Sequence, residues 1–233
     1  MSFKLRVLRA STKFFNEVNI NALNKIVSPQ LIDNVLEKTG KREIRLRKLG
    51  AVAVIWFCIA LNLFAEESYQ SVLSKLFKGL RYIWPDPNLK LPGKGALCMA
   101  RNRLGVAPMV ELFRQANKPL ADLSVSGAFL FGLRVMAIDG TIEDLADTSE
   151  LVAYFGRHPG SRGDSAFPQA QIVYLSECCT HTICDAGIWP VCADERTCAL
   201  RLLRSIFPGM LVTVDRGLIS YEMFDNVDRL LHV

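Results

Sequence analysis

The sequence predicts an α-helical N-terminal domain, residues 1–125, followed by an α/β domain, residues 130–233. Apolar residues recur at helical spacing in the first part, whereas short runs rich in β-branched residues begin near residue 130. The charge changes sign at the same place. Residues 1–128 hold 20 Lys and Arg against 9 Asp and Glu, a net charge of +11, and residues 129–233 have a net charge of −6. The basic part suits a polyanionic partner, and the acidic part suits bound cations or carboxylate chemistry.

Composition restricts the class of protein further. With 233 residues, 50% of them apolar, the chain can bury a sizeable core, which excludes a disordered tail or a disulfide-stapled miniprotein. An odd number of cysteines, seven, favours the reducing cytosol. The N-terminus has no apolar segment typical of a signal peptide, so we expect a cytoplasmic protein. Packing as small apolar side chains is favoured over a zinc site for the clustered residues Cys178, Cys179, His181, Cys184 and Cys192.

One segment allows a different interpretation. Leu49 to Ala65 is an uncharged run of 17 residues, preceded by basic residues and followed by acidic ones, as in a membrane span. However, 17 residues is at the short limit for crossing a bilayer, and Asn62 lies within the run. A central core helix is the favoured interpretation, with no membrane partner.

Several further helices are predicted in the N-terminal domain. Ser28 is placed to cap a helix over residues 29–38, and an apolar stripe predicts a helix over 69–83. Proline and glycine predict a loop over 84–95, and short helices follow at 96–104 and from Pro108. Such helices with basic residues between them are compatible with a DNA-binding module, although a solvated helix face explains any single one of them. The candidate DNA-binding residues are Lys41, Arg42, Arg45, Arg47, Lys48, Arg101 and Arg103.

The C-terminal domain is predicted to alternate strands and helices. Strands are expected at 134–139, 170–177 and 180–188, with the last two joined as a hairpin through residues 178–179. A helix over 194–207 and a buried parallel strand over 210–215 follow, and a final helix begins near Ser220.

Two aspartates occupy equivalent places in this pattern. Asp139 ends the run VMAID and Asp215 ends the run LVTVD. If the two strands pair in parallel, both carboxylates project from the carboxyl ends of the strands into one crevice. Paired carboxylates can hold Mg²⁺, which supports phosphoryl transfer. For either aspartate alone, a role in a turn or helix cap is the more common one.

Other polar residues near Asp139 have two interpretations. Asp144 and Asp147 could assist a cation, but such residues more often cap turns. Arg157, His158 and Arg162 lie in a loop rich in Gly and Pro, where they could contact DNA phosphates or be solvated.

Several segments, taken in order, resemble one protein family. They are TGKREIRLRKLGAVAVIWFCIALNLF, MARNRLGVAPMVELF, MAIDGTIEDLADT, YFGRHPGSRGDSAFPQAQIVYLSECCTHTICDAG and GMLVTVDRGLISYEMF. Together they resemble bacterial insertion-sequence transposases of the DDE class, which have an RNase H-like catalytic core, and in particular the family of insertion element four, which carries a helical N-terminal domain. The resemblance implies metal-dependent cleavage and strand transfer of double-stranded DNA at transposon ends.

The same resemblance assigns roles to residues. It implies that Asp139 and Asp215 are the first two acids of the catalytic triad and hold Mg²⁺ or Mn²⁺. The family's third acid is a Glu on a later helix, which this sequence does not contain, so a truncated copy with an incomplete RNase H-like domain is expected. Leu151 and Leu218 also depart from the family pattern. The alternative is a non-catalytic DNA-binding fragment that inhibits transposition, as a homo-oligomer or in mixed multimers with the full-length protein.

Overall fold

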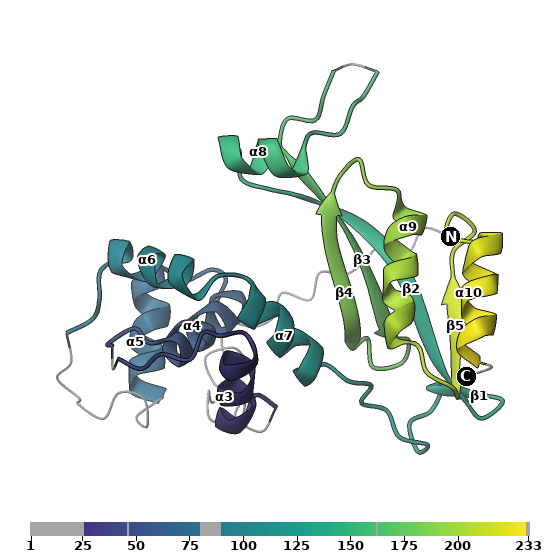
Figure 1. Cartoon of the computed structure of the whole chain (residues 1–233), viewed down its shortest axis with the longest axis horizontal. Coiled ribbons are helices and arrows are strands. Elements are labelled where there is room, and N and C mark those ends of the chain that lie inside the picture. Colours follow the sequence, from purple (N-terminus) through teal and green to yellow (C-terminus); the bar gives the residue numbers. More distant parts are fainter. Residues whose placement is uncertain (1–25, 46, 80–89, 162, 232–233) are drawn as a thin grey trace. The chain divides into compact units, whose positions relative to one another are not determined.

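The computed structural model describes residues 26–45, 47–79, 90–161 and 163–231, and it divides into two compact units, Met1–Ala116 and Asn117–Val233 (Figure 1). The segment from residue 117 to 128 falls in the second unit. Hydrogen bonds of its backbone attach it there. The amides of Leu120 and Ala121 donate to the side-chain carboxylate of Glu177, and the carbonyl of Ala128 accepts from the amide of Val135. The helical unit therefore ends about ten residues before the boundary expected from composition.

All regular secondary structure in the described residues of the first unit is helical. Its helices are α3 (Pro29–Lys38), α4 (Ala51–Leu63), α5 (Tyr69–Gly79), α6 (Lys94–Leu104) and α7 (Ala107–Ala116). The predicted cap of α3 is confirmed, because the Ser28 hydroxyl accepts a hydrogen bond from the amide of Leu31. The end of the predicted helix over 69–83 and most of the predicted loop over 84–95 lie outside the described residues.

The apolar run forms the core helix of this unit. Helix α4 is buried around most of its circumference, through Ala51, Ala53, Val54, Ile55, Trp56, Phe57 and Ala60. These side chains pack against α3 and α5, whose buried residues include Ile32, Leu36, Leu73 and Leu76. In the part of the chain that the structure describes, no helix has both the length and the apolar character needed to cross a bilayer.

The second unit is built on a mixed five-stranded sheet. Its strands are β1 (Phe129–Leu130), β2 (Leu133–Asp144), β3 (Gln169–Glu177), β4 (Ile183–Pro190) and β5 (Met210–Val214). Strands β2, β3 and β4 form an antiparallel meander, which confirms a hairpin between β3 and β4, and β5 pairs in parallel with β2. Strand β2 continues past the predicted end at Asp139 because residues 139–144 still pair with β3, and β4 begins at Ile183 rather than at residue 180. Strand β5 is half-buried rather than buried as predicted, because β2 is its only partner among the described strands.

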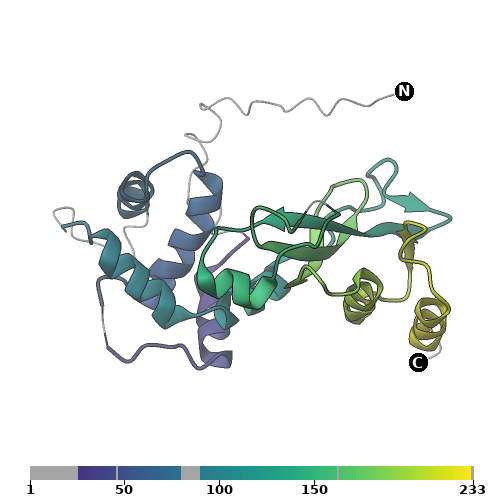
Figure 2. The same ribbon diagram turned by 90° about the horizontal axis from the view of Figure 1, so that it is seen from above.

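Helices cover one face of this sheet. Helix α9 (Glu195–Leu200), the 3₁₀ helix η1 (Arg201–Ser205) and α10 (Tyr221–Leu231) contribute to one apolar cluster with the sheet, and Figure 2 shows α9 and α10 on the same side of it. The predicted continuous helix over 194–207 changes to 3₁₀ geometry at Arg201, and Arg204 and Ser205 there hydrogen-bond the buried carboxylate of Asp185 on β4. A further helix, α8 (Ser149–Phe155), is not among the predicted elements.

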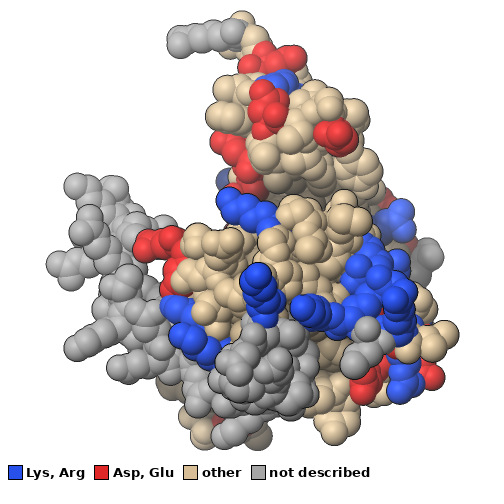
Figure 3. All heavy atoms as spheres, turned by 90° about the vertical axis from the view of Figure 1, so that its left-hand side faces the viewer, with Lys and Arg blue, Asp and Glu red and all other residues tan. Residues whose placement is uncertain are grey.

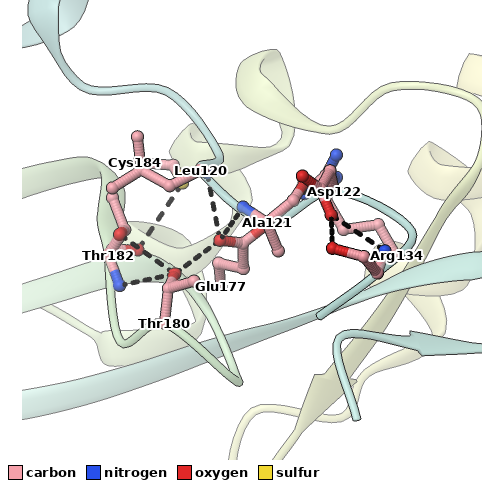
Figure 4. Close-up of polar contacts among 9 residues, drawn as sticks. Leu120, Ala121, Asp122, Arg134, Glu177, Thr180, Thr182 and Cys184 are labelled. Carbon is pink, nitrogen blue, oxygen red and sulfur yellow. Dashed lines mark hydrogen bonds and ion pairs between the residues drawn. The ribbon is translucent and has the colours of Figure 1, made fainter. Parts of the chain in front are cut away.

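A buried carboxylate attaches the segment after α7 to the sheet. The Glu177 side chain at the end of β3 is fully buried and accepts hydrogen bonds from the amides of Leu120 and Ala121 at 3.0 and 2.9 Å (Figure 4). It also accepts from the Thr180 hydroxyl and forms an ion pair with Arg134 on β2. We call these five residues the Glu177 network. All described partners of this carboxylate belong to the second unit, so the network fixes where that unit begins.

Candidate functional site

The pairing of β2 with β5 brings the two predicted aspartates into adjacent positions. The strands run in parallel, and the last pair in the register is Ile138 with Val214. Asp139, within β2, and Asp215, directly after β5, each follow that pair by one residue, so they lie at matching positions of the two parallel segments. Both residues are exposed. Seventy-five residues separate them in the chain, and the parallel crossover between the two strands unites them.

Local hydrogen bonds orient the carboxylate of Asp139. Its Oδ1 accepts from the amide of Gly140 at 2.8 Å, and its Oδ2 lies 3.4 Å from the hydroxyl of Tyr174, the directly opposed residue on β3. Partial burial raises the pKa of Tyr174, and the charge and hydrogen bond of Asp139 raise that pKa further. The phenol therefore stays protonated at neutral pH and donates to the carboxylate.

The carboxylate of Asp215 closes a tight turn. Its Oδ1 accepts from the amide of Leu218 at 2.9 Å, and Leu218 is itself buried in the core. Arg196 on α9 holds the same turn from outside, because its Nε donates to the carbonyl of Gly217 at 2.6 Å. Within the described residues, Asp215 Oδ2 has no hydrogen-bond partner, which leaves one oxygen free to bind a ligand.

Sequence reasoning did not single out the residues that support these aspartates. Arg196 looks like a solvated helix residue, and only the fold brings it to Gly217. Glu195 places its carboxylate where a side chain at Gly140 would lie, and it accepts a hydrogen bond from Gln171 at 3.4 Å. The glycine after Asp139 is the one signal that could have been noticed, since a glycine within a strand often marks a close approach.

The aspartate pair has the donor chemistry that a hard divalent cation prefers. Mg²⁺ is commonly bound by one or two protein carboxylates, with water and phosphate oxygens completing its shell. In the described ranges, the structure contains no group of three or more His, Cys, Asp or Glu side chains placed to hold a metal ion. Asp139 and Asp215 supply carboxylate oxygens, the ligand type that such a cation binds.

The predicted DNA-binding residues gather in the helical unit. Five belong to the basic loop, residues 41–48 between α3 and α4, and Arg101 and Arg103 lie in the last turn of α6. A hollow of about 390 Å³ between the loop and α6 is lined by the basic residues Lys41, Arg42, Arg45, Arg47 and Arg103 together with Glu43. Lys and Arg side chains gather on the face of the molecule that Figure 3 displays.

These basic residues differ in how they are engaged. Arg103 donates to Glu43 at 2.9 Å and to the carbonyl of Leu49 at 2.6 Å, while Lys41 donates to the carbonyl of Arg103 at 3.0 Å. Arg47 lies 3.6 Å from the same Glu43 carboxylate. Lys41 and Arg103 therefore join the loop to α6 as well as adding charge.

The remaining members are more exposed. Arg42 forms only a long ion pair with the exposed Glu37, at 3.8 Å, and Arg45 has no polar partner among the described residues. Lys48 is exposed. Arg101 contacts Cys58: burial raises the pKa of that thiol, and the nearby guanidinium partly offsets the effect.

The segment between β2 and β3 is held by its own side chains. Arg157 forms an ion pair with Asp147 at 2.6 Å and donates to the carbonyl of Ser165 at 2.9 Å. Asp144 accepts from Gln169 at 2.8 Å. These residues have structural contacts that account for them, and Arg162 lies outside the described residues.

Comparisons with known proteins find similarity to insertion-sequence transposases. Residues 17–114 match the family model described as the N-terminal region of insertion element 4 transposases. The "Transposase InsG for insertion sequence element IS4" of Escherichia coli (strain K12) is 24% identical over 212 residues, which is 88% of this chain and 45% of InsG. InsZ of the same strain is 24% identical over 193 residues, 82% of this chain and 62% of InsZ. No solved structure matches the chain significantly.

The chain is related to transposases of bacterial insertion sequences. Its residues 17–114 match the N-terminal region of the insertion element 4 transposase family, as the sequence resemblance implied. The aligned part of the chain spans 45% of the length of InsG and 62% of the length of InsZ.

Proposed function

We propose that this protein acts on double-stranded DNA as part of an insertion-sequence transposase, with its helical unit binding the transposon end and Asp139 and Asp215 binding Mg²⁺ or Mn²⁺. In this proposal the second unit is an RNase H-like catalytic domain of the DDE class. The mixed sheet and the similarity to InsG support it. The protein would act in the cytoplasm, as a homo-oligomer or together with longer relatives.

The observation that carries the proposal is the parallel register of β2 and β5. Two acidic residues far apart in sequence follow the same residue pair, Ile138 and Val214, at the carboxyl end of β5 and within β2, which continues to Asp144. Open α/β sheets bind ligands at this end of their strands. A turn or cap role for each aspartate does not require that they occupy matching positions on paired strands.

The chain's own residues prepare the two carboxylates. The amide of Gly140 and the Tyr174 hydroxyl hold Asp139, and the amide of Leu218 holds Asp215, so each carboxylate keeps one orientation. A bound divalent cation would supply activation of the attacking oxygen and charge stabilisation of the leaving oxygen in phosphoryl transfer. The second unit would thus contribute position and charge rather than a covalent intermediate.

The direct test removes one carboxylate at a time. Asp139→Asn and Asp215→Asn should each weaken Mn²⁺ binding, measured by calorimetry, by about tenfold or more, because an amide carries no charge. Asp164→Asn, an exposed residue elsewhere in the unit, should bind Mn²⁺ like the wild type. Where the wild type nicks supercoiled DNA in Mn²⁺, both site variants should lose that activity. Unchanged Mn²⁺ affinity in both would remove these residues from the site.

A second candidate function is DNA binding without cleavage, which would inhibit transposition by a full-length relative. The charge gathered at the basic loop favours it, since binding phosphates needs neither aspartate. Duplex binding in the presence of EDTA should then be retained by both aspartate variants. The logarithm of affinity should fall with the logarithm of salt concentration with a slope of about −0.9 per phosphate contacted. A salt-independent affinity would contradict this function.

A further inference from the structure

The basic loop contains one acidic residue, and its contacts are unusual for an isolated charge on a DNA-binding surface. Glu43 is surrounded in sequence by Lys41, Arg42, Arg45 and Arg47. An acidic side chain in such a place repels phosphate and would ordinarily weaken DNA binding. Its side chain is only 22% exposed, however, so it points toward the protein rather than into solvent.

Glu43 connects three parts of the helical unit. Its Oε2 accepts from the amide of Ala51 at 3.0 Å, which caps the N-terminus of α4, where Gly50 offers no side chain of its own. Its Oε1 accepts from Arg103 on α6 at 2.9 Å and lies 3.6 Å from Arg47. One carboxylate therefore links the loop to the start of one helix and the end of another.

Arg103 completes the arrangement from the side of α6. Its second nitrogen donates to the carbonyl of Leu49 at 2.6 Å, and Lys41 donates to the carbonyl of Arg103 at 3.0 Å. Both ends of the basic loop are thereby tied to α6, while Arg42 and Arg45 between them remain exposed. A loop held at both ends loses less conformational freedom when it binds, which increases affinity.

We propose that Glu43 is a positioning residue for DNA binding, which holds the basic loop so that Arg42, Arg45 and Arg47 contact phosphates together. This inference rests on the proposed DNA-binding function. It predicts the opposite sign from simple electrostatics, because removal of a negative charge from a phosphate-binding surface should otherwise tighten binding.

The test compares two variants that change the charge equally. Glu43→Gln should weaken binding of a fluorescently labelled random-sequence DNA duplex about fivefold or more and should flatten the salt dependence, because fewer phosphates are contacted at once. Glu37→Gln is the matched control: Glu37 is exposed and pairs with Arg42 at 3.8 Å, but it does not connect the loop to α6. This variant should bind as tightly as the wild type or slightly more tightly.

A third variant holds the net charge constant. Arg103→Lys keeps the positive charge but loses the planar fork that bonds Glu43 and the carbonyl of Leu49 at the same time. It should also weaken binding severalfold, and thermal unfolding of every variant shows whether the unit stays folded. If Glu43→Gln does not fold, Arg103→Lys decides the question.

The outcomes distinguish failure of the proposed DNA-binding function from failure of the proposed role of Glu43. Wild-type protein that binds no duplex contradicts the proposed function. Wild-type protein that binds, with Glu43→Gln binding as tightly as Glu37→Gln, or Arg103→Lys binding like the wild type, overturns the role of Glu43 alone.

Discussion

The two units of this protein differ in where their charged side chains lie. Among the described residues of the helical unit, the buried residues are apolar, and ion pairs such as Lys38 with Glu111 lie nearer its surface. In the second unit two carboxylates are fully buried, Glu177 in its network and Asp185 against Arg204 and Ser205. The helical unit carries its excess of basic charge at the surface, whereas the second unit also buries charged groups that fix its geometry.

This difference indicates which substitutions should lower the stability of each unit. A helical core depends on the volume of its apolar side chains, because each residue removed leaves a cavity. A buried carboxylate depends on every partner that hydrogen-bonds it, because an unsatisfied buried charge is costly. The following predictions test this comparison from the largest effect to the smallest.

The largest effect is expected in the core of the helical unit. Phe57 on α4 is completely buried, and Phe57→Ala should lower the free energy of unfolding by about 4 kcal/mol, through lost burial and the cavity left behind. Urea unfolding followed by circular dichroism measures the change. Asn62→Ala, on the exposed side of the same helix, should change the free energy of unfolding by less than about 0.5 kcal/mol. Equal effects of the two substitutions would argue against α4 as the core helix.

The second effect tests the buried charge of the sheet unit. Glu177→Gln should lower the free energy of unfolding by about 3 kcal/mol at neutral pH, because Arg134 would be left without its charged partner. Burial acts to raise the pKa of Glu177, but hydrogen bonds from Thr180, Ala121, Leu120 and Arg134 outweigh it, so that pKa is lowered in the folded state.

The sign of this shift gives a pH dependence. A lowered folded-state pKa stabilises the protein above the ordinary Glu pKa of about 4.3, and that stabilisation is lost as the pH falls through the folded-state value. The difference between wild type and Glu177→Gln should therefore shrink on acidification below about pH 4. Glu111→Gln, which removes a surface ion pair of the helical unit, should hardly move the unfolding transition. A constant difference across this pH range would show that the Glu177 charge contributes nothing.

The smallest effect concerns a helix end. Ser28→Ala removes the hydroxyl that accepts from the amide of Leu31 and should lower the free energy of unfolding by about 1 kcal/mol. Ser28→Thr keeps an acceptor at the same place and should restore most of the loss. Calorimetric melting of the three proteins makes the comparison, and identical melting temperatures would show that the cap is dispensable.

Much of the local structure followed from the sequence. The Ser28-Pro29 start of α3, the existence of the β3–β4 hairpin and the strand that precedes Asp215 were all predictable, because caps, turn residues and apolar periodicity act over a few residues. The turn of the hairpin is longer than predicted, since it spans residues 178–182. Helix α8 was missed, since seven residues carry too little periodicity to stand out from a loop.

The candidate site could be predicted only on the assumption that its two strands are neighbours. The sequence predicted that Asp139 and Asp215 both end strands, which is right for Asp215 but wrong for Asp139, since β2 continues to Asp144. Their relation depended on whether the two strands pair in parallel. Arg196, Glu195 and Tyr174 could not be assigned, because their contacts with the site are formed by residues on other elements.

Local chemistry along the chain was enough to determine the two kinds of unit and their opposite charges, and to mark two aspartates as candidates for a site. Folding in three dimensions was needed to set the register that aligns those acids, to bury Glu177 and to turn Glu43 inward among basic neighbours. The physical reason is distance along the chain. Periodicity and capping operate between neighbouring residues, whereas burial and ion pairing join residues that only the folded chain brings within a few ångströms of each other.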